Sequence, residues 1–214
     1  MDENRAPTVV VEAEIPDTTF DHTLLGNAVG SAFGAAVPYF KGIRPDVDSL
    51  KTMGAAMAAS GSVALYHVEG VTPEADAFDL EGLETVHVGA RELEDARCAL
   101  TSGSDPDLVT LGCPHLSVEE VRALARIVEG KRRSKDVEVW FCTSRDVRSR
   151  CPRECETLDR FGKVLGDTCM VVAPIEDHHS VTGTNSAKAC NYLPTLCSQK
   201  VVCAPARELL EGLM

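Results

Sequence analysis

The chain has 214 residues, enough to bury a sizeable core as one large domain or two small ones. Hydrophobic residues make up 44% and charged residues 25%, which excludes wholesale disorder. The net charge of −12 makes a nucleic-acid partner unfavourable. Because there is no membrane-length apolar run, no signal-peptide pattern and an odd count of nine cysteines, we expect a cytoplasmic protein without a membrane partner, whose thiols are free, catalytic or metal-bound.

The first hundred residues alternate between predicted strands and helices. Residues 8–12 are typical of a strand, and 20–33 form a helix rich in small residues that suits close packing. A second helix is predicted over 46–59 and a strand over 62–67. A further strand and helix are predicted over 85–89 and 91–100.

The second half continues the same alternation. Predicted strands cover 108–111, 137–142, 169–173 and 201–203. Predicted helices cover 118–129, 152–165, 186–192 and 206–213. This order predicts an α/β fold with parallel sheets covered by helices on both faces, and a sub-domain boundary near 101–107.

Residues 107–120 contain the most informative pattern. A short apolar strand runs into Gly-Cys-Pro-His, which we expect to be a turn, and a helix opens behind a Ser117-x-x-Glu120 capping box. The thiol of Cys113 and the imidazole of His115 would then lie at a strand end, beside the electropositive start of a helix. Strand ends are where α/β sheets bind ligands, so a metal or an anion fits; a buried structural Cys and a hydrogen-bonded His fit equally.

Other candidates are each open to two interpretations. Cys169 begins a predicted strand and is an apolar filler or a ligand. Residues 184–188, Thr-Asn-Ser-Ala-Lys, suit a carboxylate or phosphate with Lys188 as counter-charge, or ordinary N-capping. His67 ends a predicted strand, where a hydrogen-bonded core histidine is favoured over a catalytic one.

The remaining thiols and histidines carry weaker signals. Cys151 and Cys155 lie one helical turn apart and could share a metal, but no second pair has zinc-ribbon spacing. A solvated pair is the favoured interpretation of His178 and His179. Packing is the favoured one for three other cysteines, Cys190, Cys197 and Cys203.

Taken together, seven segments that span the whole chain resemble, in order, the catalytic large subunit of the aconitase X family. They are Asp-Glu-Asn-Arg (2–5), Val-Pro-Tyr-Phe-Lys-Gly (37–42), Met-Gly-Ala-Ala-Met-Ala-Ala-Ser-Gly (53–61), Leu-Tyr-His-Val-Glu-Gly-Val-Thr-Pro-Glu (65–74), Leu-Val-Thr-Leu-Gly-Cys-Pro-His (108–115), Asp-Thr-Cys-Met-Val-Val-Ala-Pro (167–174) and Thr-Asn-Ser-Ala-Lys (184–188). Any one of these segments is unspecific, whereas the collection is highly specific.

The resemblance implies an aconitase-like α/β/α fold, a bound iron–sulfur cluster of the 4Fe-4S rather than the 2Fe-2S type, and hydro-lyase chemistry on a small anionic substrate. A small swivel-domain subunit is implied as partner. Archaeal members resemble the large subunit of phosphomevalonate dehydratase, which removes water from mevalonate 5-phosphate to give anhydromevalonate phosphate. Bacterial relatives dehydrate cis-3-hydroxy-L-proline, and the cysteine of Gly-Cys-Pro-His favours the archaeal type. A non-catalytic fragment or metal-binding module is the competing class.

The resemblance also implies the site. By matched position, Cys113 and Cys169 are expected cluster ligands; His115, Ser186 and Lys188 catalytic residues; and Arg5, His67 and Asn185 substrate-binding residues. Family large subunits are about twice as long, and their N-terminal half carries a further cluster cysteine. Residues 1–214 therefore resemble a C-terminal part, as a fragment, a split subunit or a degenerate copy, expected to be inactive without that half and the small subunit.

Overall fold

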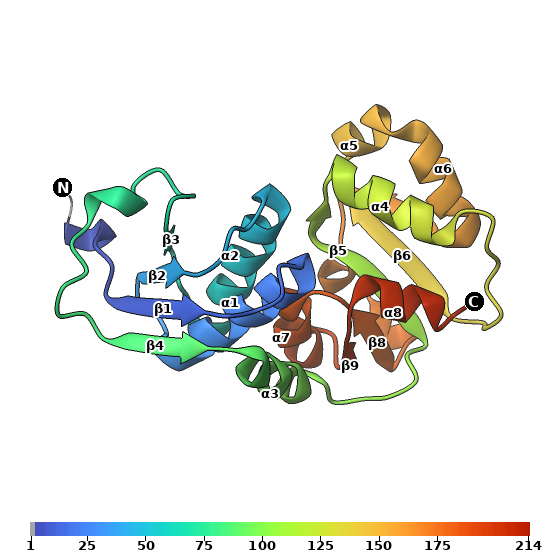
Figure 1. The fold of residues 1–214 in the computed structure, drawn as a ribbon. Helices are drawn as coiled ribbons and strands as arrows, with labels where there is room; N and C mark the ends of the chain where they lie inside the picture. The colour runs from blue at the N-terminus through green and yellow to red at the C-terminus, as the bar shows by residue number, and fades with distance from the viewer. Residues whose placement is uncertain (1–2) are drawn as a thin grey trace. The chain divides into compact units, whose positions relative to one another are not determined.

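The computed structural model describes residues 3–214 and divides into two compact units, residues 1–98 and 99–214 (Figure 1). Each unit has its own parallel sheet with helices packed on it, which confirms the predicted α/β class. Asp2, in the first matched segment, lies outside the described residues. In the described part of the chain no helix has the length and apolarity that a membrane crossing requires.

The first unit contains a four-stranded sheet in the order β3-β2-β1-β4, with all pairs parallel. Its elements are η1 (Glu3–Arg5), β1 (Val9–Ala13), α1 (Thr19–Phe33), β2 (Pro38–Lys41), α2 (Val47–Gly61), β3 (His67–Val68), η2 (Ala75–Ala77), β4 (Thr85–Val88) and α3 (Ala90–Leu100), which runs across the division.

Helices α1 and α2 begin at side-chain caps and pack closely on one another. Thr18 accepts a hydrogen bond from the Asp21 backbone, and Asp46 accepts one from Ser49. A Cβ at Gly26 would lie 2.3 Å from the backbone oxygen of Met53, so only glycine permits this approach. The predicted small-residue helix is therefore confirmed together with its close packing.

The second unit contains a five-stranded parallel sheet in the order β7-β6-β5-β8-β9. Its elements are β5 (Leu108–Leu116), α4 (Val118–Val128), β6 (Glu138–Thr143), α5 (Arg145–Arg150), α6 (Pro152–Phe161), β7 (Lys163–Gly166), η3 (Met170–Val172), η4 (Ile175–Asp177), β8 (Val181–Thr184), α7 (Ala187–Leu196), β9 (Lys200–Cys203) and α8 (Ala206–Glu211).

The strand order of the second unit creates a topological switch point between β5 and β8. The chain steps from β5 through α4 to β6 in one direction, and from β8 through α7 to β9 in the other. Right-handed crossovers then put α4 and α7 on opposite faces of the sheet. An apolar core that includes Leu111, Val121 and Leu158 joins β5 to α4 and α6. Ligands of doubly wound sheets bind beyond the carboxyl ends of the strands at such a switch point.

Several predicted elements are wrong. Of residues 62–67 only His67 is in a strand, and the short strands β2, β7 and β8 were not predicted. The helix predicted over 152–165 ends at Phe161, because Gly162 leaves the helix and β7 begins at Lys163. Residues 169–173 contain a 3₁₀ turn, Met170–Val172, instead of a strand.

The expected Gly-Cys-Pro-His turn is also wrong, because these residues lie inside β5. Leu111 pairs with Phe141 but Leu116 pairs with Thr143, so β5 bulges between them. The capping box at Ser117 and Glu120 is confirmed directly behind this bulge.

Candidate functional site

Cys113 lies in the bulge of β5, at the switch point, with 7% of its surface exposed. Burial raises the pKa of the Cys113 thiol, while the Lys188 ammonium opposes the rise and the Cys169 sulfur adds to it. Cys169 follows β7 and is half-buried. The two sulfur atoms are thus close enough for their charges to interact, at one edge of one sheet.

His115 holds the segment that carries Cys169. Its Nε2 lies 2.8 Å from the carbonyl oxygen of Thr168. The next anchor is Asp167, which accepts hydrogen bonds from the backbone N–H of Arg145 (3.0 Å) and from its guanidinium. These two contacts hold the pKa of the Asp167 carboxyl below its usual value. The start of the Cys169 segment is therefore fixed from both β5 and α5.

The N-terminus of α7 supplies the polar side of the site. Ser186 is buried, accepts a hydrogen bond from the Ala189 backbone (3.1 Å) and donates its hydroxyl proton to the carbonyl oxygen of Cys113. Asn185 and Lys188 flank it and are half-buried. The start of α7, with its backbone N–H groups and Lys188 in its first turn, therefore lies beside Cys113, an environment that suits an anion.

A third thiol, which the sequence reasoning did not single out, lies beside these two. Cys142 is fully buried near the end of β6. Burial raises the pKa of Cys142 to about 12; Cys169 and Cys113 add to the rise, and the Met170 backbone N–H opposes it. The available signal was its position at the end of a predicted strand, but a buried strand cysteine ordinarily indicates only packing.

The donor chemistry of Cys113 and Cys169 fits an iron–sulfur cluster, whose irons are held by thiolates. Within residues 3–214, however, no group of three or more His, Cys, Asp or Glu side chains is arranged to hold a metal ion. The fit is therefore partial: the two thiols can supply some of the ligands, and the others have to come from elsewhere.

Arg5 and His67, the substrate-binding candidates of the first unit, lie together. Both line a hollow of about 320 Å³. Arg5 pairs with Glu74 at 2.8 Å, and the Arg5 carbonyl oxygen lies 2.8 Å from Nε2 of His67. The His67 ring is buried 4.6 Å from that of Phe78, measured between ring centres. His67 is thus a hydrogen-bonded core histidine, as favoured, and it supports the backbone of Arg5.

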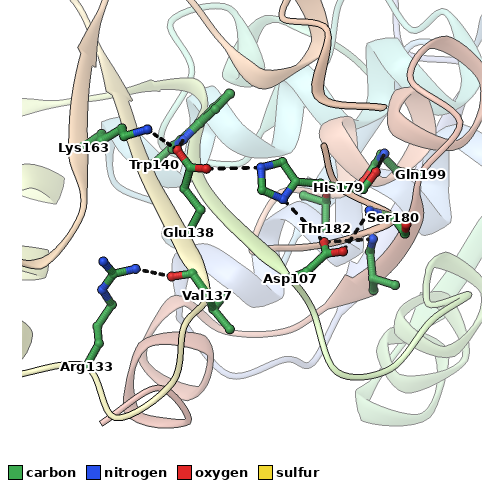
Figure 2. Close-up of polar contacts among 11 residues, drawn as sticks. Asp107, Arg133, Val137, Glu138, Trp140, Lys163, His179, Ser180, Thr182 and Gln199 are labelled. Carbon is green, nitrogen blue, oxygen red and sulfur yellow. Dashed lines mark hydrogen bonds and ion pairs between the residues drawn. The ribbon is translucent and has the colours of Figure 1, made fainter. Parts of the chain in front are cut away.

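The paired histidines of the polar loop differ from one another. His178 is exposed, in keeping with the solvated interpretation. His179 has only 12% of its side chain exposed and lies between two carboxylates, those of Asp107 and Glu138, so a solvated pair is wrong for it (Figure 2).

The comparison with known families agrees with this geometry in both units. The description "Aconitase X second domain" matches residues 7–98, and "Aconitase X third domain" matches residues 106–214. The chain belongs to the aconitase X family.

Similar curated proteins carry two different names. The phosphomevalonate dehydratase large subunit of Methanosarcina mazei is 42% identical over 204 residues, which cover 94% of this chain and 50% of that protein. That of Methanothermobacter thermautotrophicus is also 42% identical, over 94% of this chain and 52% of that protein. The cis-3-hydroxy-L-proline dehydratase of Pseudomonas aeruginosa is 36% identical, over 94% and 38%. The chain thus spans about half the length of the phosphomevalonate dehydratase subunits it matches.

A solved structure is also similar. The crystal structure of Thermococcus kodakaraensis aconitase X in its holo-form superimposes with a TM-score of 0.91 at 35% sequence identity. The match covers 100% of this chain and 57% of that one, so the fold of both units is that of an aconitase X protein.

Proposed function

We propose that this chain is part of a hydro-lyase that removes water from a small anionic 3-hydroxy acid, with mevalonate 5-phosphate as substrate and anhydromevalonate phosphate as product. The observation that carries the proposal is a pair of contacts at the carboxyl edge of the second sheet. His115 of β5 joins Thr168, the residue before Cys169, and Ser186 joins the Cys113 carbonyl oxygen to the start of α7, which carries Lys188. The phosphomevalonate dehydratase relatives at 42% identity support this substrate over cis-3-hydroxy-L-proline, whose dehydratase is 36% identical.

Cys113 and Cys169 are proposed as two thiolate ligands of an iron–sulfur cluster, of the 4Fe-4S rather than the 2Fe-2S type. When bound, such a cluster supplies a Lewis acid that makes a hydroxyl a better leaving group. The partial ligand set is consistent with a chain that spans about half of its relatives. The proposed partners are therefore the N-terminal half of a large subunit and a small swivel-domain subunit, in the cytoplasm.

The polar residues around the two thiols have separate proposed roles. Lys188 and Asn185, with the N–H groups that open α7, would hold the anionic groups of the substrate and stabilise negative charge that develops near its carboxylate. Ser186 would keep Cys113 in place by donating a hydrogen bond to the Cys113 carbonyl oxygen. His115 would hold the Cys169 segment beside the substrate hydroxyl. Direct catalytic contacts of Ser186 and His115 stay predictions.

Arg5 is proposed as a second clamp for an anionic group, with His67 supporting its backbone. Its guanidinium is paired with Glu74, so an incoming anion would have to share or displace that carboxylate. This costs part of the attraction that an unpaired guanidinium would offer.

The test is anaerobic reconstitution of the chain together with the two proposed partners. We expect a brown protein that contains iron and sulfide and converts mevalonate 5-phosphate. Cys113→Ser and Cys169→Ser should each lose most of the bound iron, while Cys98→Ser, an exposed cysteine of the first unit, should retain it.

Circular dichroism of each variant checks that the fold is kept. A colourless assembly that binds zinc would refute the cluster and favour a non-catalytic module. Undiminished iron in both site variants would refute Cys113 and Cys169 as its ligands. Turnover of cis-3-hydroxy-L-proline alone would refute the substrate but keep the reaction class.

A further inference from the structure

The segment that carries Cys169, residues 167–180, is an unusual crossover. It connects the carboxyl end of β7 to the amino end of β8, and β6 and β5 lie between these two strands in the sheet. Crossovers between parallel strands ordinarily contain an α-helix, whereas this one contains only the 3₁₀ turns η3 and η4. Two buried side chains, Met170 and Ile175, fasten its middle to the core. Without a helical backbone of its own, its position depends on such anchors.

The end of the crossover that leads into β8 is held by His179, at the amino edge of the sheet (Figure 2). The imidazole Nε2 lies 3.2 Å from Oε2 of Glu138, the first residue of β6. Its Nδ1 lies 3.8 Å from Oδ1 of Asp107, the residue before β5. One side chain therefore bridges the two strands that the crossover has to pass.

The surroundings of His179 are themselves fixed. Asp107 accepts hydrogen bonds from the backbone N–H groups of Ser180 (3.0 Å) and Val181 (3.1 Å). The amide of Gln199 donates to the carbonyl oxygen of His179 at 2.8 Å. The backbone on both sides of the imidazole is thus held where the ring can reach both carboxylates.

Glu138 is kept as a carboxylate by its other partners. It accepts hydrogen bonds from the ammonium of Lys163 and from the indole N–H of Trp140 (2.8 Å). The Lys163 contact, followed by that of Trp140, holds the pKa of Glu138 below its usual value. The charged groups that face His179 are therefore two acceptors, Asp107 and Glu138, with Lys163 behind Glu138.

We propose that His179 is a positioning residue, which clamps the crossover to the amino ends of β5 and β6 and thereby fixes the place of Cys169 at the opposite edge. It acts through residues 170–178 and does not touch the substrate. The clamp follows from contacts within this chain; only the purpose of fixing Cys169 rests on the proposed function.

The test measures how readily Cys169 reacts in the metal-free full chain. Iodoacetamide labelling, followed by mass spectrometry of each cysteine peptide, compares His179→Ala and His179→Gln with the wild type. The matched control is His178→Ala, which removes the exposed neighbour. The exposed Cys98 of the first unit serves as the internal reference, because its labelling rate should be the same in every variant.

We expect His179→Ala to label at Cys169 about fivefold faster or more, as a lost charge-assisted contact eases local opening. His179→Gln, which keeps one N–H donor, should restore part of the protection, and His178→Ala should behave as wild type. Unchanged labelling of Cys169 in His179→Ala overturns the proposal. An equal acceleration of labelling at Cys142 in β6 and Cys190 in α7 also overturns it, because His179 would then support the whole second unit.

A second measurement separates the clamp from the cluster. In the reconstituted assembly, His179→Ala should lose its visible absorbance in air faster than His178→Ala. If neither the wild type nor any variant forms a cluster, but Cys169 still labels faster in His179→Ala, the proposed function fails and the clamp stands. If all form clusters of equal lifetime and label alike, the clamp fails and the proposed function stands.

Discussion

Gly112 precedes Cys113 in the bulge of β5. Its φ is +107°, a backbone conformation that residues with a Cβ atom rarely adopt. A Cβ at this position would lie 2.1 Å from the backbone oxygen of Cys142 on the neighbouring strand. Conformation and space both demand glycine here. The place of the Cys113 sulfur is therefore set by the residue before it, through the backbone.

We expect Gly112→Ala to lower the free energy of unfolding by about 3 kcal/mol or more. The new methyl group would push β5 and β6 apart, and alanine would have to adopt a strained backbone conformation. Gly130→Ala is the control: its φ is +69°, but beyond the adjoining residues no atom lies within 4 Å of the added carbon. It should cost only about 1 kcal/mol. Urea denaturation followed by circular dichroism measures both, and equal losses would contradict the close-contact argument.

At the same scale, the sequence predicted some site residues and not others. Cys113 lies towards the carboxyl end of β5, and Lys188 lies in the first turn of α7, which follows β8, so a parallel sheet brings both to the same edge. Cys142 and His179 were missed for different reasons. A fully buried cysteine has the same pattern as any core residue, and the two carboxylates that bury His179 lie far from it in sequence, at Asp107 and Glu138.

At the scale of elements, the contact of α1 with α2 relies on Gly26. Adding a methyl group there forces the backbone of α2 to move, because the nearest atom is the Met53 carbonyl oxygen. In contrast, the atom nearest to a Cβ at Gly54 on α2 would be a ring carbon of Tyr66, at 3.0 Å, so a side chain and not the backbone would have to give way.

Gly26→Ala should therefore destabilise the first unit by about 2 kcal/mol, as overpacking of a tight interface does. Gly54→Ala should stay within about 1 kcal/mol of the wild type, because the better helix propensity of alanine offsets the displaced ring. Thermal unfolding followed by circular dichroism compares the two. A larger loss for Gly54→Ala would contradict the packing argument.

The elements that sequence reasoning predicted well are the long ones. Helices α1, α2 and α4 have caps and ten or more residues of pattern, whereas β3 has two residues and β8 has four, too few to establish a period. The crossover 167–180 was mistaken in part for a strand because Met-Val-Val-Ala is apolar. Which apolar segments join the sheet is decided by the whole fold, which no local pattern reveals.

At the scale of the whole molecule, the chain consists of two units, each with its own sheet and its own buried side chains. Separate cores of this kind ordinarily unfold as separate cooperative units. A substitution in one unit should therefore lower the stability of that unit more than that of the other.

Hydrogen exchange, measured peptide by peptide with mass spectrometry, tests this. Gly26→Ala should speed exchange in β1 and β2 of the first unit, while β5 and β6 of the second exchange as in the wild type. Gly112→Ala should show the reverse pattern. If either substitution speeds exchange equally in both sheets, the two units unfold as one.

The carboxylate of Glu138 is shared between the imidazole of His179 and the indole of Trp140, the single tryptophan of the chain. Indole emission depends on what its N–H touches. Release of the imidazole would remove one partner of the Glu138 carboxylate and so alter its contact with the indole. The wavelength of the Trp140 emission maximum is therefore expected to shift. Intrinsic tryptophan fluorescence thus reports, without any added dye, whether His179 still holds the end of the crossover that carries Cys169.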